Sequence, residues 1–156
     1  MTDAAEEAVA GLNVSRETFA KLREFEALVR RWNSAINLVS KATLADLWSR
    51  HIVDSAQVFS LYPPKAQSWV DLGSGGGFPG LVVAILAQEM KPDLRVTLVE
   101  SDLRKATFLR QASQALGVPV TVRTERIESL APQNADVLSA RALASLADLL
   151  GYAERH

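Results

Sequence analysis

The pattern of apolar and polar positions changes about 65 residues into the chain. Before that point, apolar residues recur at intervals of three and four, as in helices that bury one face. These positions are Phe19, Leu22, Phe25, Val29, Trp32 and Ile36 in a first run, and Leu44, Leu47, Trp48, Ile52, Ala56 and Phe59 in a second. After that point, short apolar runs alternate with helical patterns, which predicts parallel strands joined by helices. We therefore expect a helical N-terminal extension over residues 1–64 and an α/β domain over residues 65–156.

The limits of the elements follow from the turn residues between these runs. Helices are expected within residues 1–13 and over about 15–36, 43–60, 79–90, 102–116 and 142–153, and strands over about 68–72, 94–100, 118–123 and 135–140. Ser15 is expected to cap the long helix, the segment from Thr43 resembles a capping box, and Gly117 suits a helix end. The sheet is expected to have the strand order third, second, first, fourth.

Composition narrows the class of protein without giving a function. The 156 residues include no cysteine, which excludes disulfides, thiolate metal sites and a cysteine nucleophile. No apolar run approaches the ~18 residues of a membrane helix, and the first seven residues are not those of a signal peptide. We therefore expect a cytoplasmic protein with no membrane and no metal partner. The net charge of −1 does not argue for nucleic acid, although a local basic face could still bind it.

The stretch from Val70 to Gly80 carries the most specific chemical signal. A short apolar strand leads into a glycine-rich turn, and a strongly apolar helix follows. Glycines let the backbone approach a ligand closely, and the free N–H groups at the start of the helix would point at that ligand. The pattern therefore predicts a strand, a glycine turn and a helix that together bind a cofactor, while a tight turn without a ligand remains the simplest alternative.

Two classes of cofactor use such a turn. Residues 75–80 fit the pattern G-x-G-x-x-G, which lays the pyrophosphate of a nicotinamide or flavin dinucleotide on a helix N-terminus. Asp71, two residues before Gly73, favours a different ligand. A carboxylate there would repel a pyrophosphate but suits the cationic amino group of S-adenosylmethionine (SAM).

Further candidates are expected at the carboxyl ends of the other strands. Glu100 ends the second strand, where an acid can accept hydrogen bonds from both ribose hydroxyls of an adenosine, although a solvated strand end is the alternative. The segment Arg126-Ile127-Glu128 after the third strand is expected to reach the adenine. Arg141 follows the fourth strand, in the crevice where open α/β sheets bind ligands.

Five segments of the chain match one known family, and they occur in the same order. They are Asn37-Leu38-Val39-Ser40, His51-Ile52-Val53-Asp54-Ser55, the stretch from Asp71 to Gly80, Phe108-Leu109-Arg110-Gln111 and Ser139-Ala140-Arg141-Ala142. From about residue 15 onward the chain resembles the bacterial small-subunit ribosomal RNA guanine-N7 methyltransferases, also called glucose-inhibited division protein B. The resemblance implies a Rossmann-like SAM-dependent methyltransferase fold, SAM as cofactor, and ribosomal RNA or a ribosomal particle as partner.

The resemblance also assigns cofactor contacts to Gly73, Phe78, Ile127, Glu128 and Arg141. With the candidates taken from the pattern, the predicted cofactor site comprises Asp71, Gly73, Gly75, Gly77, Phe78, Glu100, Ile127, Glu128 and Arg141. The family continues past the last residue of this chain with further strands. The resemblance therefore implies a C-terminally shortened form, and we expect such a form to bind SAM but to methylate poorly.

Polar residues of the helical extension are the candidates on the RNA side. Asn37, Lys41, Arg50 and His51, together with Arg141, are expected to contact RNA. The pattern assigns no catalytic residue, and Asn37, His51 and Arg141 are the candidates on the RNA side of the site. His51 and Asp54 lie three residues apart on a predicted helix and are expected to hydrogen-bond. A histidine on a helix is nevertheless more often structural than chemical.

The residues also bear on the reaction. Guanine N7 has a free lone pair, so methylation needs no base, and the protein supplies mainly alignment of nitrogen, methyl and sulfur. The lack of cysteine excludes cytosine C5 methylation through a thiol adduct, and the chain has no Asn/Asp-Pro-Pro-aromatic segment of the kind used for exocyclic amines. Two alternatives remain at this point: a nicotinamide-dinucleotide-binding oxidoreductase domain, and a non-catalytic SAM- or nucleotide-binding module.

Overall fold

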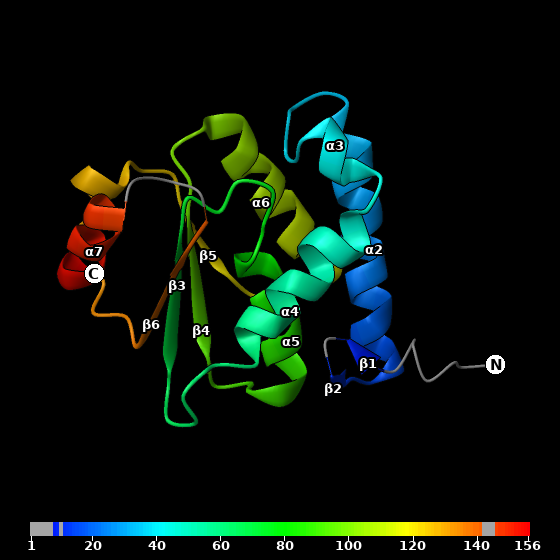
Figure 1. The fold of residues 1–156 in the computed structure, drawn as a ribbon, viewed down its shortest axis with the longest axis horizontal. Coiled ribbons are helices and arrows are strands. Elements are labelled where there is room, and N and C mark those ends of the chain that lie inside the picture. Colours follow the sequence, from blue (N-terminus) through cyan, green and yellow to red (C-terminus); the bar gives the residue numbers. More distant parts are fainter. Residues whose placement is uncertain (1–7, 10, 142–145) are drawn as a thin grey trace.

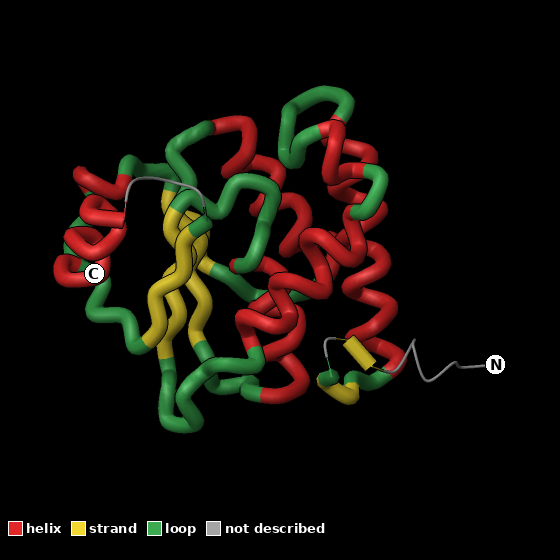
Figure 2. The backbone as a smooth tube through the Cα atoms, viewed as in Figure 1, coloured by secondary structure: helices red, strands yellow, loops and turns green. Residues whose placement is uncertain are grey.

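A parallel sheet with helices on both faces forms the centre of the molecule (Figures 1 and 2). The computed structural model describes residues 8–9, 11–141 and 146–156. The strands of the sheet are β3 (Ser68–Leu72), β4 (Arg95–Val99), β5 (Thr121–Arg123) and β6 (Val137–Ala140). They lie in the order β5-β4-β3-β6, and every pairing is parallel. The Rossmann-like fold class and the predicted strand order are both confirmed.

Most of the described helices pack on one side of this sheet, and α7 packs on the other (Figure 1). The first group comprises α2 (Arg16–Asn33), α4 (Asp54–Phe59), α5 (Gly80–Met90) and α6 (Leu103–Leu116). On the opposite side lie α7 (Leu146–Arg155) and the 3₁₀ turn η2 (Ile127–Ser129). None of the helices in the described ranges is long and apolar enough to cross a membrane.

The sheet also separates the hydrophobic core into two clusters. The larger cluster surrounds α5, whose residues 80–87 are all buried, as expected for a helix that is apolar on every side. It also includes Phe25 of α2 and Phe108 of α6, so the helical extension shares its core with the sheet. The smaller cluster lies under α7 and includes Val70, Leu72 and Ile127. The division into parts at residue 64 stays a prediction.

The long helix α2 is fixed at both ends by side chains. The Ser15 hydroxyl accepts a hydrogen bond from the Thr18 N–H at 3.2 Å, which confirms the predicted cap. The helix ends at Asn33 rather than near Ile36, because the buried Asn33 Oδ1 accepts hydrogen bonds from the Leu38 and Val39 N–H groups. The amide thereby orders the turn that follows.

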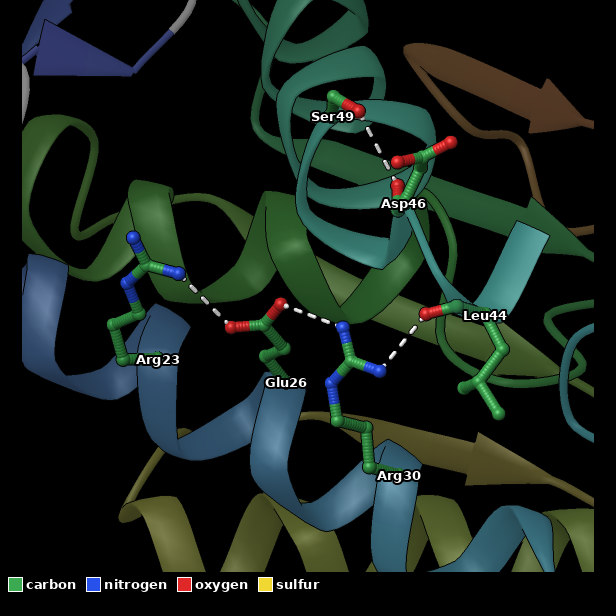
Figure 3. A network of polar contacts seen from close by, with 6 residues as sticks. All are labelled: Arg23, Glu26, Arg30, Leu44, Asp46 and Ser49. Atoms are coloured by element: carbon green, nitrogen blue, oxygen red, sulfur yellow. Dashed lines mark hydrogen bonds and ion pairs between the residues drawn. The ribbon is translucent and has the colours of Figure 1, made fainter.

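A charged network fastens α2 to the segment after it (Figure 3). Glu26 pairs with Arg23 at 3.0 Å and with Arg30 at 3.4 Å, and Arg30 also donates to the Leu44 carbonyl at 2.8 Å. The Arg23 guanidinium lies 3.9 Å from the centre of the Trp48 ring. Although each contact is exposed and individually weak, together they hold the segment around Leu44 and Trp48 against α2.

Two of the sequence-based expectations for the extension are wrong. Instead of a helix before residue 14, the described part forms a small antiparallel pair, β1 (Ala8–Val9) and β2 (Leu12–Asn13). Gly11 has a φ of 80° between them, and Val9 is 1% exposed, so a turn and apolar burial outweigh the helix propensity of the alanines. Residues 1–7 and 10 lie outside the described residues.

The second error concerns the helix expected over residues 43–60. It is divided into α3 (Lys41–Leu44), a π-helical segment η1 (Trp48–Val53) and α4. Ser40, not Thr43, is the cap, because its hydroxyl accepts from the Thr43 N–H at 3.3 Å. In the last predicted helix, residues 142–145 lie outside the described residues, and the described part runs from Leu146 to Arg155.

Candidate functional site

The turn between β3 and α5 is built on glycine conformations. Gly73, Gly75 and Gly77 have φ values of 68°, 53° and 96°, a region that side chains with a Cβ rarely adopt. At Gly77 an added Cβ would also lie 2.8 Å from Cζ of Phe25. These glycines therefore provide both the backbone path and the close packing of the turn on α2.

Asp71 lies beneath this turn rather than facing an opening. It is 1% exposed, its Oδ1 accepts a hydrogen bond from the Ser139 hydroxyl at 2.7 Å, and its Oδ2 accepts from the Gly80 N–H at 3.1 Å. Burial raises the pKa of Asp71 to about 6, against the opposing effect of these hydrogen bonds. The carboxylate thus ties β3 to β6 and to the first turn of α5.

We expect Asp71 to make the free energy of unfolding depend on pH. Because its pKa rises from 3.8 to about 6 on folding, its stabilising contribution is full below pH 3.8 and is lost as the pH rises through about 6. A rise of this size corresponds to ~3 kcal/mol. Urea unfolding of the wild type and of Asp71→Asn should show their difference changing by about that amount across this range. A difference that stays constant with pH would contradict the assignment.

Glu100 fixes the opposite side of the glycine turn. Its Oε1 accepts a hydrogen bond from the Gly75 N–H at 2.8 Å, and its Oε2 accepts from the Asp102 N–H at 2.8 Å. A carboxylate has about four acceptor positions, so about two remain for the hydroxyl groups of a ligand. Asp102 in turn caps α6, as its Oδ1 accepts from the Arg104 and Lys105 N–H groups.

A cavity of about 450 Å³ opens at the carboxyl ends of the strands, beside Glu100. The predicted cofactor residues in its lining are Gly73, Gly75, Glu100, Ile127, Glu128 and Arg141. Asp71 and Gly77 lie outside this lining, and Phe78 lines a second cavity. The structure therefore brings most of the predicted set together around one space.

The lining also contains residues that sequence reasoning missed. Tyr152 of α7 donates a hydrogen bond from its hydroxyl to Glu128 Oε1 at 2.9 Å. The backbone N–H of Glu128 and this hydroxyl hold the pKa of the Glu128 carboxyl below its usual value. Lys105 lines the same cavity and lies three residues after Asp102, the cap of α6. Its position in the first turn of a helix that follows a strand could have marked Lys105 as a lining residue. No pattern in the sequence indicated that Tyr152 contacts Glu128.

The second cavity, of about 230 Å³, adjoins the first. Both are lined by Gly73, Gly75 and Arg141, which form their shared wall. The rest of the second lining is largely apolar side chains and glycine backbone: Leu38, Val39, His51, Ser74, Gly76 and Phe78. The turn containing Leu38 and Val39 is the one ordered by Asn33, so this wall is preformed.

Among the polar residues of the extension that were expected to contact RNA, only His51 lines a described cavity. His51 lines the second cavity, with its Nδ1 3.3 Å from Arg141 Nη1 and its Nε2 3.0 Å from Thr43 Oγ1. The expected hydrogen bond between His51 and Asp54 is wrong, because Asp54 instead pairs with Arg141 at 3.8 Å. The other predicted RNA contacts, Asn37, Lys41 and Arg50, are exposed, and each lies within two residues of a lining residue in the sequence.

Within the described ranges, no group of three or more acidic, histidine or cysteine side chains could hold a metal ion. The lining of the two cavities combines glycine backbone and apolar side chains with carboxylates and with cationic side chains, namely Lys105, Arg126 and Arg141. Such a setting suits an organic ligand with hydroxyl groups next to a flat apolar ligand.

Comparison with known proteins gives consistent matches. Residues 18–156 match the family model described as rRNA small subunit methyltransferase G. The chain is 58% identical over 145 residues to ribosomal RNA small subunit methyltransferase G of Ruegeria sp. (strain TM1040), covering 93% of this chain and 70% of that protein. It is 61% identical over 145 residues to the protein of that name from Ruegeria pomeroyi, covering 93% and 71%. The protein of that name from Cereibacter sphaeroides (strain ATCC 17025 / ATH 2.4.3) is 56% identical over 145 residues, covering 93% and 70%.

Proposed function

The chain belongs to the rRNA small subunit methyltransferase G family, and from this premise we propose that it transfers a methyl group from SAM to N7 of a guanine in small-subunit ribosomal RNA. Such a reaction needs a methyl donor and a base side by side. The observation that carries the proposal is the pair of adjoining cavities that share Gly73, Gly75 and Arg141.

We place the donor in the larger cavity, and the residues there fit it. Glu100 has free acceptor positions for the two ribose hydroxyls, and Ile127 and Glu128 lie on the side assigned to the adenine. At Gly75 an added Cβ would meet no atom closer than the Gly73 carbonyl at 3.9 Å, so the backbone leaves this space to the ligand. SAM supplies an electrophilic methyl group when bound, and the chain's residues hold and orient the donor.

We place the guanine in the smaller cavity, between the apolar side chains of Leu38, Val39 and Phe78. Guanine N7 needs no deprotonation, so the work of the protein is to align the two ligands and exclude water. The proposed contacts to the surrounding RNA are Asn37, Lys41 and Arg50, which lie close in the sequence to the lining residues Leu38, Val39 and His51. Small ribosomal subunits are the proposed partner, and the cytoplasm is the proposed site of action.

The oxidoreductase alternative is not favoured, because the relatives are named as methyltransferases. A non-catalytic module is not favoured for the same reason.

The test is calorimetric titration with SAM and S-adenosylhomocysteine, together with transfer of labelled methyl groups to small ribosomal subunits. Glu100→Gln keeps the shape but loses charge-assisted acceptance, so it should bind the donor more weakly by ~1.5–3 kcal/mol. Large ribosomal subunits are the control substrate and should take no label. Wild-type protein that binds neither compound would refute the proposed donor site, and Glu100→Gln with unchanged affinity would remove Glu100 from it.

A further inference from the structure

Arg141 stands at the wall between the two cavities, and it is held there from the helical side of the molecule. Its Nη1 lies 3.3 Å from His51 Nδ1, and its Nη2 lies 3.8 Å from Asp54 Oδ2. These partners are about 90 residues away in the sequence, on the segment that runs from η1 into α4. The guanidinium therefore joins the sheet domain to the extension at the point where the cavities meet.

The contact defines the protonation state of His51. An arginine side chain can only donate hydrogen bonds, so His51 Nδ1 must accept and the imidazole must be neutral with its proton on Nε2. The Nε2 atom lies 3.0 Å from the hydroxyl of Thr43, which itself donates to the Ser40 carbonyl at 3.2 Å. The hydroxyl can accept from Nε2, so every atom of this chain of contacts has a consistent role.

The backbone under His51 is unusual in the same place. Residues Trp48 to Val53 form a π-helical segment, a rare conformation that occurs mostly as single-turn insertions in α-helices and is frequent at functional sites. The imidazole also packs on the ring of Phe78, with the ring centres 4.9 Å apart. Because Phe78 follows the glycine turn, the ring of His51 is fixed between Arg141, Thr43 and that turn.

We infer that His51 is a positioning residue, whose neutral imidazole holds Arg141 at the wall between the two cavities and thereby links the extension to donor binding. The inference rests on the proposed function for the identity of what each cavity holds. It assigns His51 no contact with the reacting atoms, and the contact with Arg141 itself stands independently of the ligands.

The arrangement should be sensitive to pH. Protonation of His51 would remove the acceptor at Nδ1 and place a second cation against Arg141. The charged groups around His51 are Arg141, Asp54 and Arg50, and Asp71 lies beyond Arg141. Burial lowers the pKa of His51 below 6.5, and the Arg141 charge adds to this, while Asp54 opposes it. The contact is therefore complete above pH 6.5 and is lost as the pH falls through the lowered value.

Two variants separate the acceptor from the ring. His51→Asn places an amide oxygen near the position of Nδ1 and keeps the acceptor without the ring, whereas His51→Leu fills space without an acceptor. At pH 7.5 we expect S-adenosylhomocysteine to bind about tenfold more weakly to His51→Leu and within about threefold of the wild type to His51→Asn. Equal binding by His51→Leu and the wild type, or an equal loss in both variants, would overturn the inference.

The pH profile adds a second measurement. Wild-type affinity should fall between pH 7.5 and 5.5, and the part of the fall due to His51 should be missing in His51→Asn. Any part of the fall that remains in both proteins is independent of His51; Asp71, whose pKa burial raises to about 6, titrates in the same range. Identical profiles for the two proteins would overturn the inference.

A third measurement does not depend on the ligand. Nitrogen-15 NMR of the imidazoles should show His51 as the neutral Nε2–H tautomer at pH 7.5, with His156, the other histidine of the chain, as the internal comparison. An Nδ1–H tautomer or an imidazolium at that pH would refute the contact. If the wild type binds no S-adenosylhomocysteine while the tautomer is as expected, the proposed function fails and the contact between His51 and Arg141 stands.

Discussion

Replacing Gly80 with alanine is expected to lower the free energy of unfolding by about 3 kcal/mol, at the upper end of what overpacking a core costs. Gly80 begins α5 in the fully buried centre of the fold. An added Cβ would overlap a methyl group of Leu98 and would lie 2.5 Å from Asp71 Oδ2. Neither neighbour can move freely, because Leu98 is buried in β4 and Asp71 is held by Ser139 and by the Gly80 N–H itself.

Gly151→Ala is the matched control for this substitution. Gly151 lies within α7, and an added Cβ there would meet no atom within 4 Å. Alanine is the better helix former, so this variant should gain up to ~1 kcal/mol. Urea unfolding of both variants measures the difference. A Gly80→Ala protein as stable as the wild type would show that the turn is not packed on Asp71 and Leu98 as described.

The strands were predictable because each strand is a short apolar run bounded by turn residues, and their order is the one common in doubly wound α/β sheets. Because parallel strands present their carboxyl ends at the same edge, Glu100, Ile127, Glu128 and Arg141 were expected close together, and all four line one cavity; their role as cofactor contacts stays a prediction. The strands and the positions of their ends needed only periodicity and chain direction, which are local properties of the sequence, whereas the strand order depends on the fold class.

The orientation of Asp71 was also within reach of the sequence. Successive side chains of a strand point to opposite faces. Val70 and Leu72 face the cluster under α7, whereas Trp69 and Asp71 face the side of α5, where both contact the Ser139 hydroxyl. The position of Asp71 at the end of a strand suggested a ligand contact. The alternation of side chains instead places Asp71 on the face toward α5, which favours a buried structural role. Whether a donor amino group comes near Asp71 stays a prediction.

Other features could not be obtained from local patterns. The π-helical segment shares its apolar spacing with an ordinary helix, so periodicity does not distinguish the two. The partners of Arg141 and of Tyr152 depend on how distant segments pack. The small strand pair near Gly11 forms because Val9 is buried in the main core, which outweighs the composition of that segment.

Replacing Gly75 with valine is expected to abolish binding of the proposed donor while the protein remains folded. Gly75 lines both cavities, and its only near neighbour for an added Cβ is the Gly73 carbonyl at 3.9 Å. The Cβ of the new side chain would therefore meet no protein atom at clashing distance, and the side chain would extend into ligand space. Its φ of 53° adds a strain of about 1–2 kcal/mol for a residue with a Cβ. Titration with S-adenosylhomocysteine, with circular dichroism to check the fold, measures both effects.

Gly117→Val separates the strain from the occupied space. Gly117 has a similar φ of 66°, an added Cβ there would meet no atom within 4 Å, and it ends α6 outside the lining of both cavities. This variant should lose about the same 1–2 kcal/mol of stability and bind S-adenosylhomocysteine like the wild type. If both variants lost binding equally, backbone strain rather than the cavity would explain the result. If Gly75→Val bound S-adenosylhomocysteine normally, the donor would have to lie elsewhere, because a valine side chain at this position would extend from the shared wall into the proposed donor space.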